Sequence, residues 1–164
     1  PYLSGGGYHE IKNGGVLKIH ADFNRHPSLE LDRRVNLLLY LNKSWKEEWG
    51  GNLELYSPNN LQEPVVKVTP EFNRCVIFNT TSYTYHGHPE VISCPEGISR
   101  KSIALYYFST GRPKSEVSEK HSTMWKEVKG ETFEPDPLTF GKIIKKVTPP
   151  IIFDFIKGIH KKLK

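Results

Sequence analysis

Short runs rich in β-branched and aromatic residues, separated by turn-forming residues, dominate the first two thirds of the chain. These runs occupy residues 16–21, 35–41, 52–56, 65–69, 75–78 and 101–108. Runs of this length, bounded by Gly, Pro, Asn and Ser, are typical of strands. Several of them in succession predict an antiparallel sandwich or barrel. We therefore expect a mainly β domain.

The size and composition of the chain restrict its class. With 164 residues it is long enough for one domain with its own core. No apolar run approaches the length of a membrane span, and no signal peptide opens the chain. The two cysteines, Cys75 and Cys94, are too few for a disulfide framework and predict reduced thiols. These features favour a cytoplasmic location.

The positive charge is concentrated near one end of the chain. The net charge is +5, but much of the excess lies in residues 142–164. A local excess favours an anionic partner for that segment and does not mark the whole domain as nucleic-acid binding. We expect no specific nucleic-acid partner, and the sequence does not indicate an oligomeric state.

A change in composition after residue 113 predicts a domain boundary. Residues 1–113 are expected to form the core, and residues 114–164 a charged extension. Thr148, followed by two prolines, can cap a helix near the end of that extension. Its apolar residues recur at helical spacing at Ile152, Phe155, Ile156, Ile159 and Leu163. This short amphipathic helix could pack on the protein or contact an anionic membrane or partner.

The tripeptide His20-Ala21-Asp22 closes the first apolar run. Side chains two apart on a strand point to the same face, so His20 and Asp22 could hold one metal ion. A histidine from a second strand would complete a facial triad of two histidines and one carboxylate, the ligand set of non-haem Fe(II) sites. Alternatively, His20 and Asp22 form only a hydrogen-bonded surface pair.

Two downstream histidines compete for the third ligand position. His86 directly ends the segment 80–85 and is the preferred ligand. His88 lies two residues later and would reach the same face if the segment stays extended, although Gly87 could break that extension. Both alternatives stay open at this level.

Arg100 stands at the start of the last apolar run and is a candidate anion ligand. Its planar guanidinium can hold a carboxylate through two parallel hydrogen bonds, which lysine cannot do. Ser102, two residues along, would share its face and could add a hydroxyl donor. The simpler alternatives are a salt bridge at the strand end for Arg100 and a small packing residue for Ser102.

Together these residues resemble the 2-oxoglutarate- and Fe(II)-dependent oxygenases, in particular the prolyl-4-hydroxylase-like branch. The resemblance runs from about residue 14 to residue 113. It rests on residues 18–24, 33–45, 50–56, 72–78 and 100–108, which agree in order and spacing. It implies a double-stranded β-helix, or jelly roll, in which His20, Asp22 and His86 bind iron. It also implies that Arg100 binds 2-oxoglutarate.

The implied reaction is hydroxylation of an unactivated C–H bond with O2 and 2-oxoglutarate, releasing succinate and CO2. Ascorbate is an expected accessory reductant, as in relatives. The prime substrate is not indicated: a peptidyl proline, another peptide, a glycan or a small molecule would each fit the family. Two alternatives are a cupin-like metalloenzyme and a jelly-roll binding module without catalytic turnover.

Two departures from the family pattern lead to further expectations. Many prolyl hydroxylases place a tyrosine against the co-substrate carboxylate, but the matching position here is taken to be Leu39, with Tyr40 facing away. Ser102 or Tyr8 would then assist Arg100. The helices that precede the family's core are absent, which predicts missing N-terminal residues and an exposed apolar surface.

The loop at residues 45–51 lies where family members bind substrate. Its tryptophans, Trp45 and Trp49, could contact a peptide or a sugar. The alternative, which we prefer, is that both tryptophans cover the edge of the sheet.

Overall fold

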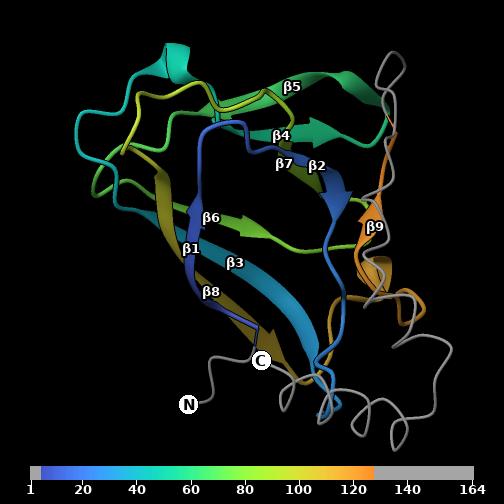
Figure 1. Ribbon diagram of the computed structural model, residues 1–164. Helices are drawn as coiled ribbons and strands as arrows, with labels where there is room; N and C mark the ends of the chain where they lie inside the picture. Colours follow the sequence, from blue (N-terminus) through green and yellow to red (C-terminus); the bar gives the residue numbers. More distant parts are fainter. Residues whose placement is uncertain (1–4, 128–164) are drawn as a thin grey trace, which may run out of the picture. The chain divides into compact units, whose positions relative to one another are not determined.

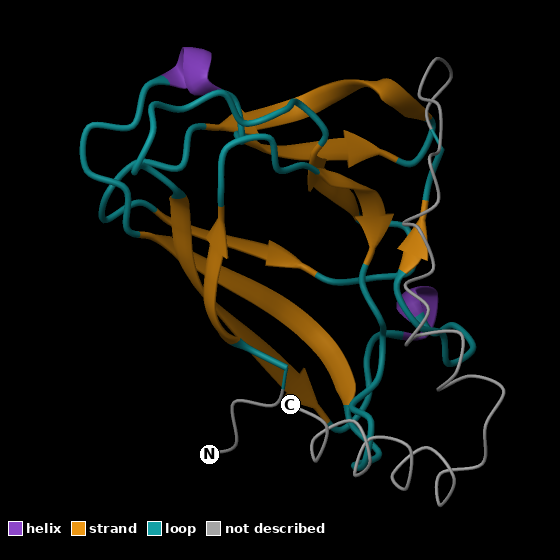
Figure 2. Ribbon diagram, viewed as in Figure 1, coloured by secondary structure: helices purple, strands orange, loops and turns teal. Residues whose placement is uncertain are grey.

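The computed structural model describes residues 5–127, which lie within one compact unit (Figure 1). Within this range the chain is mainly β (Figure 2). The strands are β1 (Gly7–Ile11), β2 (Leu17–Ala21), β3 (Asp32–Tyr40), β4 (Leu53–Ser57), β5 (Asn60–Val68), β6 (Cys75–Asn79), β7 (Tyr85–His88), β8 (Arg100–Ser109) and β9 (Met124–Trp125). Two short 3-10 helices, η1 (Glu47–Trp49) and η2 (Lys114–Glu116), lie in the connections.

The strands form two antiparallel sheets, consistent with the expected jelly roll. The four-stranded sheet has the order β1-β8-β3-β6, and the five-stranded sheet has the order β5-β4-β7-β2-β9. Figure 1 shows the two sheets facing each other across the molecule. Strands adjacent in each sheet are mostly distant in the sequence, so each sheet is assembled by long-range pairing.

A β-bulge in β3 determines which of its residues face the other sheet. The pairing of β3 with β8 shifts between Arg33 and Val35. A bulge inserts one residue and changes the phase of the alternation between the two faces. After it, Asn36, Leu38 and Tyr40 point inward, as their place in a cavity wall or a core cluster shows.

Residues 57–64, which lie between two of the expected strands and are rich in turn-forming residues, are largely strand in the structure. β5 begins at Asn60, and Pro64 pairs with Tyr56 of β4. A proline is tolerated because β5 lies at the edge of its sheet, where one row of backbone donors needs no partner. The six predicted runs otherwise correspond to strands, with shifted ends.

The space between the sheets is closed by a cluster to which both contribute. Tyr40 and Phe78 from the four-stranded sheet pack against Leu53 from the five-stranded sheet. A second cluster consists of Ile19, Ala21, Tyr56 and Tyr85 of the five-stranded sheet, and Met124 of β9 packs against it. The chain beyond residue 113 therefore contributes to the body of the protein.

One sequence expectation concerns residues outside the described range, and another remains untested. The amphipathic helix expected near the end of the extension lies beyond residue 127, and the domain boundary at residue 113 stays a prediction. Among residues 5–127, no helix is long and apolar enough to cross a membrane.

The outer face of the four-stranded sheet carries exposed apolar side chains. Tyr8, Ile77 and Tyr107 are 56%, 64% and 50% exposed. Ile77 pairs with Leu37, and Tyr107 with Val35, so these side chains follow the outward phase of β3. An exposed apolar surface on this sheet agrees with the sequence expectation.

The side chain of Asn42 links Pro70, in the connection between β5 and β6, to Lys101 of β8, so its removal should lower stability. Its amide donates to the carbonyls of Pro70 (2.7 Å) and Lys101 (3.0 Å), and its oxygen accepts from the Lys101 N–H (2.6 Å). Asn42→Ala leaves these largely buried groups unpaired, so the free energy of unfolding should fall by about 2–3 kcal/mol. Urea denaturation measures this free energy of unfolding. The control Asn59→Ala, at an exposed position, should change it by less than about 0.5 kcal/mol. Equal effects of the two substitutions would contradict the stabilising role of Asn42.

Candidate metal centre

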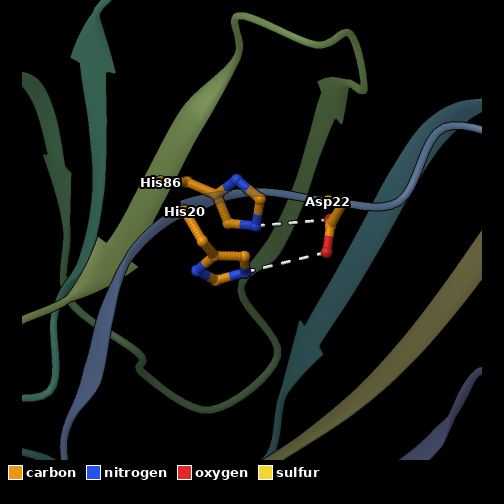
Figure 3. Close-up of side chains that lie close together, drawn as sticks. All are labelled: His20, Asp22 and His86. Atoms are coloured by element: carbon orange, nitrogen blue, oxygen red, sulfur yellow. Dashed lines mark ion pairs between the residues drawn. The ribbon is translucent and has the colours of Figure 1, made fainter. Parts of the chain in front are cut away.

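His20, Asp22 and His86 converge between the sheets (Figure 3). One potential ligand atom from each residue lies within 4.8 Å of the others. His20 Nε2 lies 3.7 Å from Asp22 Oδ1, and His86 Nε2 lies 3.4 Å from Asp22 Oδ2. All three side chains are buried. Two imidazoles and a carboxylate at this spacing could hold a divalent ion and leave further coordination positions open.

The pairing of β2 with β7 brings the two histidines together. His20 lies directly opposite His86, and their ring centroids are 4.4 Å apart. Asp22 follows the last residue of β2 and therefore shares the face of His20. The two-residue spacing of His20 and Asp22 and the pairing of His20 with His86 are sufficient to assemble the triad.

Asp22 is held from the neighbouring sheet. Arg33 Nη2 and Asn36 Nδ2, both from β3, donate to Asp22 Oδ2 at 3.0 and 2.7 Å. Burial alone would raise the pKa of Asp22. Hydrogen bonds with His20 and His86 and the charges of His86 and Arg33 outweigh burial and hold that pKa well below its usual range. The carboxylate is therefore ionised at neutral pH, as a metal ligand must be.

Backbone carbonyls orient both imidazoles. His20 Nδ1 lies 2.8 Å from the Lys18 carbonyl, and His86 Nδ1 lies 3.5 Å from the Thr84 carbonyl. With a proton on Nδ1, each imidazole would offer the Nε2 lone pair to a bound metal in place of a hydrogen bond to Asp22.

A cavity of about 100 Å³ extends from the triad into the space between the sheets. Its lining combines the triad with polar groups from β3, β7 and β8 and apolar groups from both sheets: His9, Ile11, Leu17, His20, Asp22, Asn36, Leu38, Leu53, Phe78, His86, His88, Arg100, Ser102 and Tyr106.

Arg100 is a fixed and buried cation in this cavity. Its Nε donates to the Gly51 carbonyl at 2.6 Å, and its Nη2 donates to the Tyr40 hydroxyl at 3.3 Å. Burial lowers the pKa of Arg100, and Tyr40 partly offsets this. An arginine nevertheless stays charged at neutral pH. Burial also raises the pKa of Tyr40, so its hydroxyl keeps its proton.

The structure corrects the expected orientation of Tyr40. The sequence analysis expected Leu39 to take the matching position and Tyr40 to face away. In the structure, Tyr40 is fully buried and contacts Arg100. The bulge in β3 sets this phase, because after it Asn36, Leu38 and Tyr40 are the residues that face inward. Of the proposed helpers of Arg100, Ser102 lines the cavity and Tyr8 does not.

The two competing histidines both point into the cavity, but only His86 joins the triad. Gly87 keeps an extended conformation within β7, so His86 and His88 share a face. His88 is 1% exposed. Burial and the charge of Arg100 lower the pKa of His88 to about 3, so its ring is neutral.

Sequence reasoning did not identify the side chains that support the triad. Arg33 and Asn36 are three residues apart, and only the β3 bulge directs both at Asp22. Trp125 of β9 places its ring 4.8 Å from His20 although it lies beyond the predicted core. A lone tryptophan in a charged segment was the available signal for it.

A second, open pocket of about 650 Å³ is lined in part by residues that follow Asp22 in the chain, and several of its lining residues are basic. Its lining is Phe23, Arg25, Pro27, Lys120, His121, Ser122 and Thr123.

The tryptophans of the 45–51 loop pack together. Trp45 is 6% exposed in a cluster with Ile92 and Cys94, and its ring meets Trp49 edge to face. Packing is the role that the structure supports for them.

Comparisons with known proteins agree with this geometry. A family model described as the 2OG-Fe(II) oxygenase superfamily matches residues 6–108. Prolyl 3-hydroxylase OGFOD1 of Mus musculus is 34% identical over 79 residues, which are 46% of this chain and 14% of that protein. Its Xenopus laevis counterpart is 33% identical over 78 residues, 46% of this chain and 15% of that protein. The match thus spans only about one seventh of the length of these curated relatives.

One solved structure with similarity to this chain is a prolyl hydroxylase of Trichoplax adhaerens, in complex with a peptide fragment of the hypoxia inducible factor oxygen degradation domain. It shares 26% sequence identity, with a TM-score of 0.47. The alignment covers 62% of this chain and 41% of that one.

Because His86 groups with His20 and Asp22 and His88 does not, substitutions of the two histidines should affect metal binding differently. His86→Ala should abolish tight Mn²⁺ binding, because it removes one of three ligands, whereas His88→Ala should retain it. Calorimetric titration of each purified variant with Mn²⁺ measures the affinity. The opposite ranking would assign the third ligand position to His88.

The hydrogen bond from Asn36 to Asp22 predicts that Asn36 affects metal binding indirectly. Asn36→Leu removes one hydrogen bond to Asp22 and should weaken Mn²⁺ binding roughly 10- to 100-fold. Asn79→Leu, at an exposed position of β6, is the matched control and should bind Mn²⁺ as the parent protein does. Equal affinities for the two variants would show that Asn36 does not orient the carboxylate.

Proposed function

Because the chain belongs to the 2OG-Fe(II) oxygenase superfamily, we propose that it is a hydroxylase with Fe(II) held by His20, Asp22 and His86. The proposed reaction inserts oxygen into an unactivated C–H bond and converts 2-oxoglutarate to succinate and CO2. The observation that carries this proposal is one cavity lined by both a facial triad and a buried arginine. The proposed architecture is the jelly roll.

The three candidate ligands come from neighbouring strands. His20 and Asp22 lie on or just after β2, His86 lies on β7, and all three line the cavity, so an ion held by them would be open to it. Fe(II), when bound there, supplies the oxidising chemistry with O2 and the 2-oxo acid. The chain supplies the orientation of the ligands, through Arg33 and Asn36 on Asp22 and through backbone carbonyls on the imidazoles.

Arg100 is proposed to hold the far carboxylate of 2-oxoglutarate. A buried guanidinium already oriented by Gly51 and Tyr40 binds a carboxylate with little further ordering. Tyr40, which keeps its proton, could donate its hydroxyl to the same carboxylate, and Ser102 is proposed as an additional donor. A cupin-like reaction without a dicarboxylate would leave this buried cation without a role.

Apolar walls separate the site from water. Leu38, Leu53 and Phe78 line the cavity together with the polar groups. A site closed in this way strengthens the charge interactions within it and limits side reactions. We propose ascorbate as the reductant that restores the metal after unproductive turnovers.

The prime substrate is proposed to be a peptide, with a prolyl residue as the first candidate. The name of the curated relatives, prolyl 3-hydroxylase, supports this choice. The open pocket lined by Phe23, Arg25 and Lys120 follows Asp22 directly in the chain and offers room for an extended segment. Its two cations would favour acidic neighbours of the reacting residue.

Arg100 variants test the proposed function. Arg100→Leu removes at least two charge-assisted hydrogen bonds and should weaken 2-oxoglutarate binding more than about 100-fold. Arg100→Lys keeps the charge but not the planar fork and should lie between that variant and the parent protein. Anaerobic titration of the Fe(II)-loaded protein, followed by its visible charge-transfer band, measures the affinity.

The control is Arg74→Leu, because Arg74 pairs with Glu71 at the surface. This variant should bind 2-oxoglutarate as the parent protein does. Absence of binding by the metal-loaded parent protein would contradict the proposed function. Normal binding by Arg100→Leu would place the carboxylate elsewhere.

A further inference from the structure

His88 is a buried side chain that the proposed reaction does not yet use. It is 1% exposed, and in the described part of the chain neither ring nitrogen has a hydrogen-bond partner. A neutral imidazole carries one N–H donor and one acceptor. Leaving both unpaired in a buried place is unfavourable, and such groups are uncommon in folded proteins.

The register of the five-stranded sheet locates His88 along the cavity. Leu55 of β4 pairs with His86, and Glu54 pairs with Gly87. Continuing this antiparallel register places Leu53 beside His88. Gly51, two residues further, accepts the hydrogen bond from Arg100.

The neighbours of the segment that runs from Leu55 back to Gly51 are therefore His86, then His88, then Arg100. His88 and Arg100 both line the same cavity. A 2-oxo diacid with its keto end at the triad and its far carboxylate at Arg100 would pass this ring.

We propose that His88 donates a hydrogen bond to the far carboxylate of bound 2-oxoglutarate, beside Arg100. This inference rests on the proposed function. It explains why an unpaired imidazole is kept where an apolar side chain would pack at lower cost, because its partner arrives with the ligand. A carboxylate accepts several hydrogen bonds, so Arg100 and Tyr40 do not exclude a third donor.

The geometry separates this role from metal binding. His20, Asp22 and His86 group within ligand distance of one another, and His88 is not a member of that group. His88 is thus a ligand-binding residue at the far end of the co-substrate, not a fourth metal ligand.

Substitution by leucine tests the proposal. His88→Leu should weaken 2-oxoglutarate binding to the Mn²⁺-loaded protein roughly 10- to 100-fold, the effect of one hydrogen bond to a charged group. Mn²⁺ affinity should not change. Because leucine removes the unpaired polar atoms, the thermal midpoint of the metal-free protein should stay the same or rise. If His88 had only a structural role, its replacement would lower the thermal midpoint.

Two controls sharpen the test. The monoacid 2-oxopentanoate has the same carbon chain without the far carboxylate, so the parent protein and His88→Leu should bind it equally. His26→Leu is the matched variant, since His26 accepts hydrogen bonds from its own loop at Ser28 and Leu29. It should not change 2-oxoglutarate affinity. His88→Gln keeps an N–H donor and should retain part of the affinity.

Each alternative outcome has a distinct meaning. If the Mn²⁺-loaded parent protein binds no 2-oxoglutarate, the proposed function fails and the inference with it. If the parent protein binds and His88→Leu binds equally well, only the role of His88 is overturned. Equal losses for 2-oxoglutarate and 2-oxopentanoate, or a loss of Mn²⁺ affinity, would also overturn the contact with the far carboxylate.

Discussion

The contact between Asp22 and the β3 pair Arg33 and Asn36 is the interaction on which the rest of the site depends. It ties the strand that carries His20 to the opposite sheet and directs the carboxylate at both imidazoles. Arg33 is 1% exposed and its guanidinium lies between the rings of Phe23 and Tyr106, at 4.2 and 3.6 Å from their centroids. Removing one partner of a buried ion pair of this kind costs about 3–5 kcal/mol, because the other charge is left unpaired.

The cavity brings together charges and polar atoms that an apolar core would not contain. A negative centre at Asp22 and a positive centre at Arg100 both lie in its wall, and His88 adds two unpaired nitrogens. Folding alone gives no reason to bury them, since each loses its hydration. A dicarboxylate and a divalent cation would neutralise them, so the arrangement is understandable as a site prepared for ligands.

Much of the site could be predicted because it depends on local spacing. His20 and Asp22 share a face through the two-residue repeat of a strand, and Arg100 and Ser102 do so by the same rule. Tyr40, Arg33 and Asn36 could not be placed in this way, because the bulge in β3 reverses the alternation. Trp125 and Arg112 were missed for another reason: their contacts are distant in sequence. Arg112, at the predicted end of the core, donates to the carbonyls of Asn24 and Arg33 and so anchors the chain that continues to β9.

The amino-acid pattern alone predicts a mainly β fold and a His-x-Asp pair that could bind a metal, because apolar periodicity and two-residue spacing are local properties of the chain. The family was indicated by the resemblance of longer stretches. Three features needed the folded chain: the histidine that groups with His20 and Asp22, the hydroxyl that accompanies Arg100, and the side chains that orient Asp22. These choices depend on strand register, and register is set by long-range pairing: β2 against β7, and β3 against β8. A shift of one residue in either pair would turn the same side chains to the opposite face.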